Sequence, residues 1–413
     1  MKMTYIYNKV LPAKTAVMAL LLIMSSCTYD EGQETYSVNV SLTQALEGMP
    51  VQMTNSLATS FTEMTDENGT AHFILPAGIY GASVSKVEDD GYFRNVYNGS
   101  MSDIVIGQGS TDVILPVSKT SMQTANPLVI KELYIGGCSK DDGSGIFAID
   151  KCLIIYNNSA SVVSLDNVAI GMVEPYNAEA STHSFLSGGV LEYAGEDWIP
   201  AINGIWYFQD GQQIAPYSEL VINICGAIDN TLTYSNSVNY ANPEYYCTYD
   251  VEATSSDGGK YNNTLYYPSP SEVIPVSHYL KAVKYGKGNA WPMSQTAPAV
   301  MLFKTEGTSP RLFAGDISNI IYPSGKQDDI IYACLKLPRA WVLDAVEVYN
   351  ANKLADCKKR LTPDLDNGYV TLLNGYGHSL VRKVEKTVDG HDVYQDTNNS
   401  TNDFYETDHC SLR

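Results

Sequence analysis

Short runs of alternating apolar and polar residues, separated by turn-forming residues, recur along the chain. The run Tyr36–Leu42 reads YSVNVSL, and Asn68-Gly69 and Gly78 supply turns soon after it. A period of two residues places side chains alternately on the two faces of a strand, whereas an amphipathic helix needs a period near 3.6 residues. From residue 126 onward the sequence has no long helical pattern. It therefore predicts a mainly β protein made of short strands.

The size and composition of the chain fit this fold class. Its 413 residues suit two or three domains, and 44% of them are hydrophobic, as in a folded globular protein. The chain contains 30 tyrosines, a residue type that favours pleated, half-buried surfaces.

The chain is strongly acidic, with a net charge of −20. Removing the segment before Cys27, which carries three lysines and no acid, takes this charge to about −23. Such a surface repels phosphate backbones, so nucleic acid is not an expected partner. It also repels anionic lipids, so attachment to a membrane would need an anchor and not a basic patch.

The N-terminal segment has the layout of an exported lipoprotein. Lysines occupy its first half, an apolar run Ala16–Met24 follows, and two serines precede Cys27. The run is shorter than the roughly 20 residues that span a bilayer, which predicts a signal peptide over residues 1–26, cleaved before a lipidated Cys27. Asp30 and Glu31, in the tether over residues 27–35, resemble a surface-export tag. We expect the outer membrane, with the cell surface favoured over the periplasmic face.

The next segment predicts a small sandwich over residues 36–120. We expect about seven short strands here, with turns at Asp66–Gly69 and at residues 76–78. Thr65–Gly69, Phe73, Leu75–Gly78 and Tyr80 resemble the turns of the carboxypeptidase regulatory-like (transthyretin-like) module. The resemblance implies a spacer or docking sandwich without catalysis.

Residues 126–413 predict a larger β domain, whose first strands resemble a lamin-tail-like immunoglobulin-type sandwich. Its C-terminal part is more distinctive: Trp341–Glu347, Arg360-Leu361, Asp366–Tyr369, Arg382-Lys383 and Asp396–Phe404. Together these segments resemble the lipoprotein family of domain of unknown function 4876. That resemblance implies a lipobox, a regulatory-like sandwich and a lamin-tail-like domain. It implies no activity, and residues 210–330 depart most from the family pattern.

Two acidic loops are candidates for calcium. Asp396–Asp403 is dense in oxygen ligands, and Asp364, Asp366 and Asn367 precede Gly368. Neither loop matches the EF-hand spacing. The favoured interpretation is that these side chains cap their own turns, with Arg382 and Lys383 nearby for charge balance.

The sequence predicts no catalytic residues and no cofactor. The six histidines at positions 72, 183, 278, 378, 391 and 409 form no zinc motif, and a convergence of the last three is the weaker alternative. No nucleophile elbow or phosphate-binding glycine loop is present. A pair of catalytic carboxylates stays possible, because their separation is a property of the fold.

Seven cysteines follow Cys27, at positions 138, 152, 225, 247, 334, 357 and 410. An oxidising compartment would allow up to three disulfides. Proximity in the sequence favours Cys138 with Cys152 and Cys225 with Cys247, and partial or absent pairing is an equal alternative.

Three functions remain open. The first is a non-catalytic, outer-membrane binding lipoprotein, accessory to an uptake receptor. The second is a carbohydrate-active hydrolase that uses an Asp/Glu pair. The third is a glycan-binding or adhesive module, for which the loop tyrosines Tyr245-Tyr246 and Tyr266-Tyr267 are the best candidates.

Overall fold

The structure is a computed structural model that describes residues 34–89, 93–123, 127–180, 185–250, 252–253, 271–284, 293–323, 326–327 and 329–413. The predicted signal peptide, Cys27, Tyr266 and Tyr267 lie outside these residues. Among the helices of the described residues, none combines the length and the apolar character that a bilayer crossing requires.

The first eight strands form two sheets. Their bounds are β1 (Thr35–Leu42), β2 (Pro50–Asn55), β3 (Ser60–Met64), β4 (Thr70–Pro76), β5 (Gly78–Asp89), β6 (Phe93–Ile106), β7 (Thr111–Leu115) and β8 (Ser118–Gln123). One sheet has the order β4-β1-β7 and the other β3-β2-β5-β6-β8. On β1 the alternate residues Val38, Val40 and Leu42 are buried, as the period of two predicts. Their side chains help to fill a single core between the sheets.

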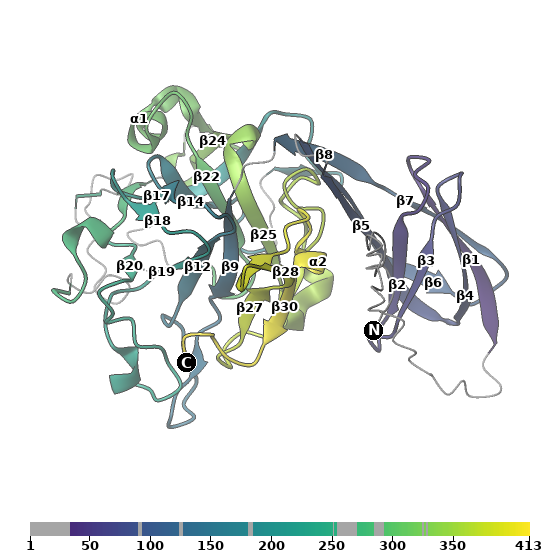
Figure 1. Cartoon of the computed structure of the whole chain (residues 1–413), viewed down its shortest axis with the longest axis horizontal. Coiled ribbons are helices and arrows are strands. Elements are labelled where there is room, and N and C mark those ends of the chain that lie inside the picture. Colours follow the sequence, from purple (N-terminus) through teal and green to yellow (C-terminus); the bar gives the residue numbers. More distant parts are fainter. Residues whose placement is uncertain are drawn as a thin grey trace, which may run out of the picture.

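The remaining strands form the larger part of the molecule (Figure 1). Its longer strands are β9 (Leu128–Tyr134), β12 (Cys152–Asn157), β14 (Val168–Val173), β17 (Trp198–Tyr207), β19 (Glu219–Asn223), β22 (Ala299–Lys304), β24 (Cys334–Pro338), β25 (Val342–Asn350), β27 (Ser379–Arg382), β28 (Val384–Val388), β29 (His391–Tyr394) and β30 (Phe404–Thr407). The short strands are β10 (Cys138–Ser139), β11 (Ile146–Phe147), β13 (Val163–Ser164), β15 (Leu186–Ser187), β16 (Val190–Leu191), β18 (Gln213–Ile214), β20 (Tyr246–Cys247), β21 (Lys281–Val283), β23 (Ile320–Ile321) and β26 (Val370–Leu372).

Helices in the described residues are short. They are η1 (Asn230–Leu232), η2 (Val276–His278), α1 (Pro310–Gly315), η3 (Ile317–Asn319), η4 (Ile330–Tyr332), η5 (Arg339–Trp341), η6 (Ala351–Asp356) and α2 (Ser400–Asp403). The prediction of a mainly β fold is confirmed.

Two sheets face each other in this larger part. A six-stranded sheet has the order β20-β19-β12-β9-β27-β30, and an eight-stranded sheet follows the path β23-β24-β17-β14-β22-β25-β26, with β21 beside β17. The core between them draws apolar side chains from both sheets. Burial of this apolar surface is the main driving force for such a sandwich.

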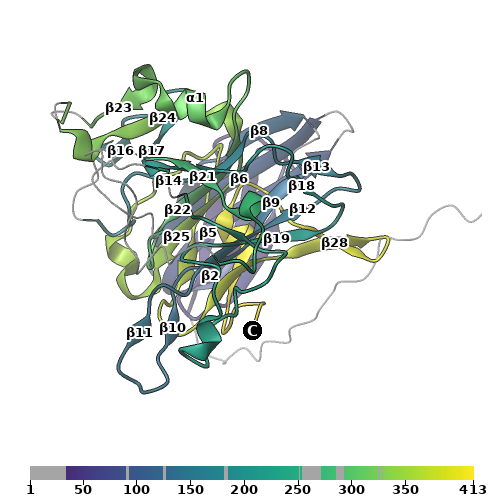
Figure 2. The same cartoon turned by 90° about the vertical axis from the view of Figure 1, so that its left-hand side faces the viewer.

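Both sheets are also covered on their outer faces. The eight-stranded sheet carries a second apolar cluster to which Phe313 and Ala314 of α1 contribute. On the six-stranded sheet a smaller cluster includes Tyr134, Cys152 and Cys410. Cys410 belongs to the segment after β30, so the end of the chain packs on the outside of this sheet (Figure 2).

The first sandwich touches the larger part through polar contacts. The Ser100 hydroxyl on β6 donates to the Asn367 carbonyl at 2.7 Å, and the Thr120 hydroxyl on β8 donates to the Asp364 carbonyl at 3.5 Å. In Figure 1 strands β5 and β8 lie on the side of the first sandwich that faces the larger part. The loop Asp364–Gly368, which the sequence marks as a motif, therefore lies at the junction.

Candidate functional site

Arg382 links the two sheets of the larger part through a buried charge network. Its guanidinium pairs with Asp344, lies 3.5 Å from an Asp396 oxygen and 3.8 Å from an Asp403 oxygen, and donates to the Ile130 carbonyl at 2.7 Å. Arg382 belongs to the six-stranded sheet and Asp344 to β25 of the facing sheet. All four charged side chains are buried. This network therefore connects sheet to sheet.

One guanidinium cannot neutralise three carboxylates. Burial raises the pKa of Asp344 to about 7 and that of Asp403 to about 6; Arg382 opposes this shift and the Asp396 charge adds to it. Burial disfavours the charge of Arg382, but the carboxylates outweigh this effect and raise its pKa. The network therefore holds protons at a pH where free aspartates have lost them.

The acidic loop over residues 396–403 caps itself, as its favoured interpretation predicts. Asp403 accepts hydrogen bonds from the Thr397 amide at 2.8 Å, the Thr397 hydroxyl at 2.7 Å and the Asn399 amide at 3.2 Å. The Asn399 side chain caps α2 by accepting from the Thr401 amide at 3.1 Å. N–H and O–H donors occupy these oxygens, which does not suit a calcium site. In the described residues no three acidic, histidine or cysteine side chains are placed to hold a metal ion.

The second acidic candidate is also occupied by protein donors. Asp366 accepts from the amides of Ser400 at 2.8 Å, Gly368 at 2.9 Å and Glu347 at 2.9 Å. A Cβ on Gly368 would lie 2.0 Å from the Asn399 side-chain oxygen, so the close approach of the two loops requires glycine.

Glu347 is paired with Arg360, and both are fully buried. Burial alone would raise the pKa of Glu347, but Arg360 and Lys359 outweigh it and hold that pKa below its ordinary value. The Arg360 guanidinium also donates to the Pro175 carbonyl at 2.9 Å. Arg382, Asp366, Glu347 and Arg360, which belong to the segments that carry the family resemblance, thus form buried structural contacts.

The C-terminal histidines converge only in part. His378 lies 2.7 Å from a Glu406 oxygen, and His409 lies 2.5 Å from an oxygen of Asp408. His391 instead stacks on Tyr217, with ring centroids 4.9 Å apart. The convergence of all three histidines is therefore wrong, although two of them lie near the end of the chain.

All seven described cysteines are free, so neither disulfide favoured by sequence proximity is present. Cys138 hydrogen-bonds to Asp150, and burial, with Asp150 next in weight, raises its pKa to about 12. Burial, with a smaller contribution from the nearby Cys225, raises the pKa of Cys247, and the two thiols are not joined. Pairing of β19 with β20 thus brings Cys225 near Cys247 without a disulfide.

Tyr246 is wrong as an exposed binding tyrosine. Its side chain is buried and packs against Phe208 and His278, with centroid distances of 5.5 and 4.1 Å. Tyr245 is half-buried.

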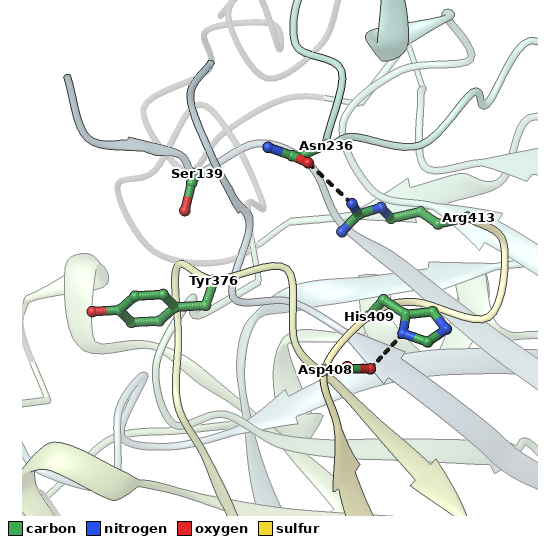
Figure 3. A pocket seen from close by; sticks show the side chains of 6 residues that line it. All are labelled: Ser139, Asn236, Tyr376, Asp408, His409 and Arg413. Atoms are coloured by element: carbon green, nitrogen blue, oxygen red, sulfur yellow. Dashed lines mark hydrogen bonds and ion pairs between the residues drawn. The ribbon is translucent and has the colours of Figure 1, made fainter. Parts of the chain in front are cut away.

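A polar pocket of about 480 Å³ opens where the end of the chain meets two loops. It is lined by Ser139, Asn236, Tyr376, Asp408, His409 and Arg413 (Figure 3). We call it the tail pocket, because residues 408–413, the C-terminal tail, supply half of its lining. Ser139 ends β10, Asn236 follows η1, and Tyr376 lies in the loop between β26 and β27.

The arginine of the tail pocket is placed by its neighbours. Its guanidinium donates to the Asn236 side-chain oxygen at 3.3 Å (Figure 3). Gly377 has a φ of +84°, and a Cβ there would lie 2.7 Å from an Arg413 nitrogen. A larger residue at this position would therefore displace Arg413. The adjacent Tyr376 side chain is 61% exposed, so its ring is available to a ligand.

Buried carboxylates hold the pocket-forming segments in place. Glu132, the acid embedded in apolar strand β9, accepts from the Ser411 amide at 3.0 Å and from the Ser379 hydroxyl at 2.6 Å. Asp150 accepts from the Tyr134 hydroxyl at 2.7 Å and from the Val238 amide at 3.4 Å. Glu132 thus fixes the tail to the sheet, and Asp150 fixes the loop that carries Asn236.

Serine, histidine and aspartate occur together in the pocket without forming a catalytic triad. The Ser139 hydroxyl donates to the Gly375 carbonyl at 3.2 Å, and Figure 3 shows Ser139 and His409 on different sides of the pocket. The partner of His409 is its sequence neighbour Asp408. A nucleophile needs its base within hydrogen-bond reach, and this arrangement provides no such contact.

Comparison with known families identifies the C-terminal part of the chain. A family model described as "Protein of unknown function (DUF4876)" matches residues 215–411. Over these residues the chain belongs to the DUF4876 family. The family prediction made from the C-terminal motif is thus confirmed. No curated protein matches the sequence at a significant level.

Two solved structures are similar to this chain. A DUF4876 family protein from Bacteroides thetaiotaomicron VPI-5482 matches with 20% identity and a TM-score of 0.55, over 90% of this chain and 94% of that chain. A DUF3823 family protein from Parabacteroides merdae ATCC 43184 has 11% identity and a TM-score of 0.17, over 42% of this chain and 91% of that chain. The similarity to the DUF4876 structure supports the fold alone. The TM-score of the DUF3823 structure is too low to support a shared fold.

The DUF4876 segment contains most of the tail pocket: Asn236, Tyr376, Asp408 and His409. Sequence reasoning missed this pocket because its lining comes from four separate segments of the chain. One signal was present in the sequence: glycines flank Tyr376 on both sides, which marks a tightly turned loop.

Replacing Arg382 with leucine should lower the free energy of unfolding by about 3–5 kcal/mol, because three buried carboxylates lose their cation. Arg339→Leu is the matched control: Arg339 is partly exposed, forms an ion pair with Asp364 at 3.0 Å and donates to the Thr362 hydroxyl at 3.4 Å, so its loss should cost about 0–1 kcal/mol. Chemical denaturation measures the free energy of unfolding of the wild-type protein and of both variants. Equal losses would contradict a central role for Arg382.

Asp396→Asn should flatten the pH dependence of stability. Asp344 and Asp403 have raised pKa values in the folded state, so the folded protein binds more protons than the unfolded chain between pH 4 and 7. Stability from these groups is full below pH 4 and is lost as pH rises towards 7. Removing the Asp396 charge lowers both pKa values.

The test of this prediction is the melting temperature of the wild-type protein and of Asp396→Asn from pH 4 to pH 8. The variant should show the smaller fall in this range. An unchanged slope would mean that Asp396 does not raise the pKa values of its neighbours.

Proposed function

We propose that this protein is a non-catalytic, lipid-anchored binding protein that holds a neutral saccharide in its tail pocket. The observation that carries the proposal is the lining of that pocket: an exposed tyrosine ring beside a guanidinium, an amide, a hydroxyl, an imidazole and a carboxylate. Donors and acceptors are thus mixed around one aromatic face. Its volume of about 480 Å³ lies in the range of ligand sites.

The charges of the pocket support a neutral, hydroxyl-rich ligand. Arg413 is opposed by Asp408, whose side chain is 84% exposed, and the whole chain has a net charge of −20. An anionic ligand would be repelled at long range. An apolar ligand would leave the polar lining unpaired, at a cost for each buried group. Sugar hydroxyls both donate and accept, and a sugar's C–H face packs on an aromatic ring.

The absence of an activated nucleophile supports binding in preference to hydrolysis at this pocket. The Ser139 hydroxyl is engaged with a carbonyl, and Asp408 is the one carboxylate in the lining. Acid–base hydrolysis of a glycoside needs two carboxyl groups that flank the bond. The lining therefore supplies contacts for recognition and not the pair of groups that cleavage requires.

The anchor belongs to the same proposal. The layout of residues 1–27 supports cleavage before Cys27 and lipid on its thiol. Acyl chains contribute about 0.8 kcal/mol for each buried CH₂ group, so two or more chains hold the protein to the membrane. An anchored saccharide-binding protein could present its ligand to an outer-membrane uptake receptor.

Tyr376→Ala should weaken binding of the recognised oligosaccharide roughly tenfold, a loss of about 1.4 kcal/mol. Tyr405→Ala is the matched control, because Tyr405 is 47% exposed on β30 and does not line the pocket. An array of neutral and uronate-containing oligosaccharides selects the ligand, and calorimetric titration measures the affinities. Equal weakening by both variants, or no binding by the wild type, would contradict the proposal.

Cys27→Ala should release the protein from the membrane fraction. Its measure is the protein's distribution between membrane and soluble fractions, with incorporation of labelled palmitate as a second readout. Cys357→Ala, a half-buried cysteine far along the chain, is the control and should stay with the membrane. Retention of Cys27→Ala, still without label, would point to a different attachment.

A further inference from the structure

Two thiols meet beneath the C-terminal tail. Cys152 begins β12 of the six-stranded sheet, and Cys410 lies in the tail that supplies half of the tail pocket. Both side chains have no exposed surface, and they pack in one cluster with Tyr134 and Val221. The Cys152 side chain is the largest influence on Cys410 and, with burial next, raises the pKa of Cys410 well above its ordinary value.

Three of the other thiols have different partners, whereas Cys225 and Cys247 lie near each other but in different packed clusters. Cys138 bonds to Asp150, Cys334 donates to the Tyr332 carbonyl at 3.6 Å, and Cys357 donates to the Lys353 carbonyl at 3.4 Å. A disulfide needs two sulfurs that already lie close, on side chains directed towards each other. In the part of the chain that the structure describes, Cys152 and Cys410 are the two cysteines that pack in one buried cluster, whereas Cys225 and Cys247 lie in separate clusters.

We propose that Cys152 and Cys410 are an oxidation site, at which a disulfide joins the tail to β12. The oxidant is a disulfide, either on a thiol oxidoreductase or as oxidised glutathione. The Cys410 thiolate attacks one sulfur of the oxidant, which releases one thiol and leaves a mixed disulfide. The Cys152 thiolate then displaces the second thiol. The pair loses two protons and two electrons, and the oxidant is reduced to two thiols.

Detachment of the tail would expose both thiols, because they are buried while the tail is docked. Strand β30 ends at Thr407, and residues 408–413 beyond it are held by Glu132 through the Ser411 amide at 3.0 Å. Because both thiols are buried in the folded protein, oxidation takes place before the tail docks or while it is detached. The product fixes the backbone next to Asp408 and His409, so it stabilises the tail pocket that the proposed function uses.

The test is peptide mapping of the full chain after oxidation with oxidised glutathione. Unreacted thiols are alkylated in denaturant, and the digest is analysed by mass spectrometry without reduction. We expect a linked peptide pair that contains Cys152 and Cys410 and lacks two hydrogens. Cys410→Ser should lose this pair, whereas Cys334→Ser, at a buried cysteine in another cluster, should keep it.

Hydrogen exchange gives an independent readout. Amides of residues 408–413 should exchange more slowly in the oxidised protein than after reduction, and Cys152→Ser should show no such difference. Alkylation of both Cys152 and Cys410, a link to another cysteine, or equal exchange in the two states would overturn the proposal. Saccharide binding is measured separately, so its failure would be distinguishable from failure of the disulfide.

Discussion

The larger part of this protein depends on the pairing of Arg382 with Asp344 across two facing sheets. A buried charge is tolerated only when it is paired and hydrogen-bonded, and Arg382 also takes two backbone carbonyls as acceptors. Asp396 and Asp403 bring the segment before β30 to the same guanidinium. Arg382 therefore holds the C-terminal segment in place through its contacts with Asp396 and Asp403.

The position of the tail pocket follows from this network. Asp403 ends α2 and is followed directly by β30, which pairs with β27 and leads into the tail. Glu132 on β9 then fixes Ser411 on the outer face of the same sheet. The last family segment, Asp396–Phe404, and the C-terminal tail thus lie on one continuous stretch of chain that joins the buried network to the tail pocket.

The fold class was accessible from the sequence because alternation along strands such as β1 reports burial directly. The loop over residues 396–403 was interpreted correctly, since Asx and Ser/Thr side chains in a short run find their own amides. Asp366 instead accepts mainly from the amides of Ser400 and Glu347 in other segments, which the sequence could not reveal. The partners of Arg382 were only partly accessible, because Asp344 comes from another sheet. The pocket was inaccessible: Ser139, Asn236 and Tyr376 are distant in sequence, and Tyr246 was mistaken for an exposed ring because clustering of tyrosines does not reveal which face is covered.

We propose that the DUF4876 segments support the fold while a nearby pocket binds a saccharide without cleaving it. Ligand-observed NMR on an oligosaccharide selected from the array tests both parts in one sample. We expect the saccharide signals to be attenuated in proportion to the fraction of saccharide that is bound. The integrated intensity of the reducing-end anomeric signals should stay constant over time. New reducing ends, formed at a rate proportional to protein concentration, would contradict it.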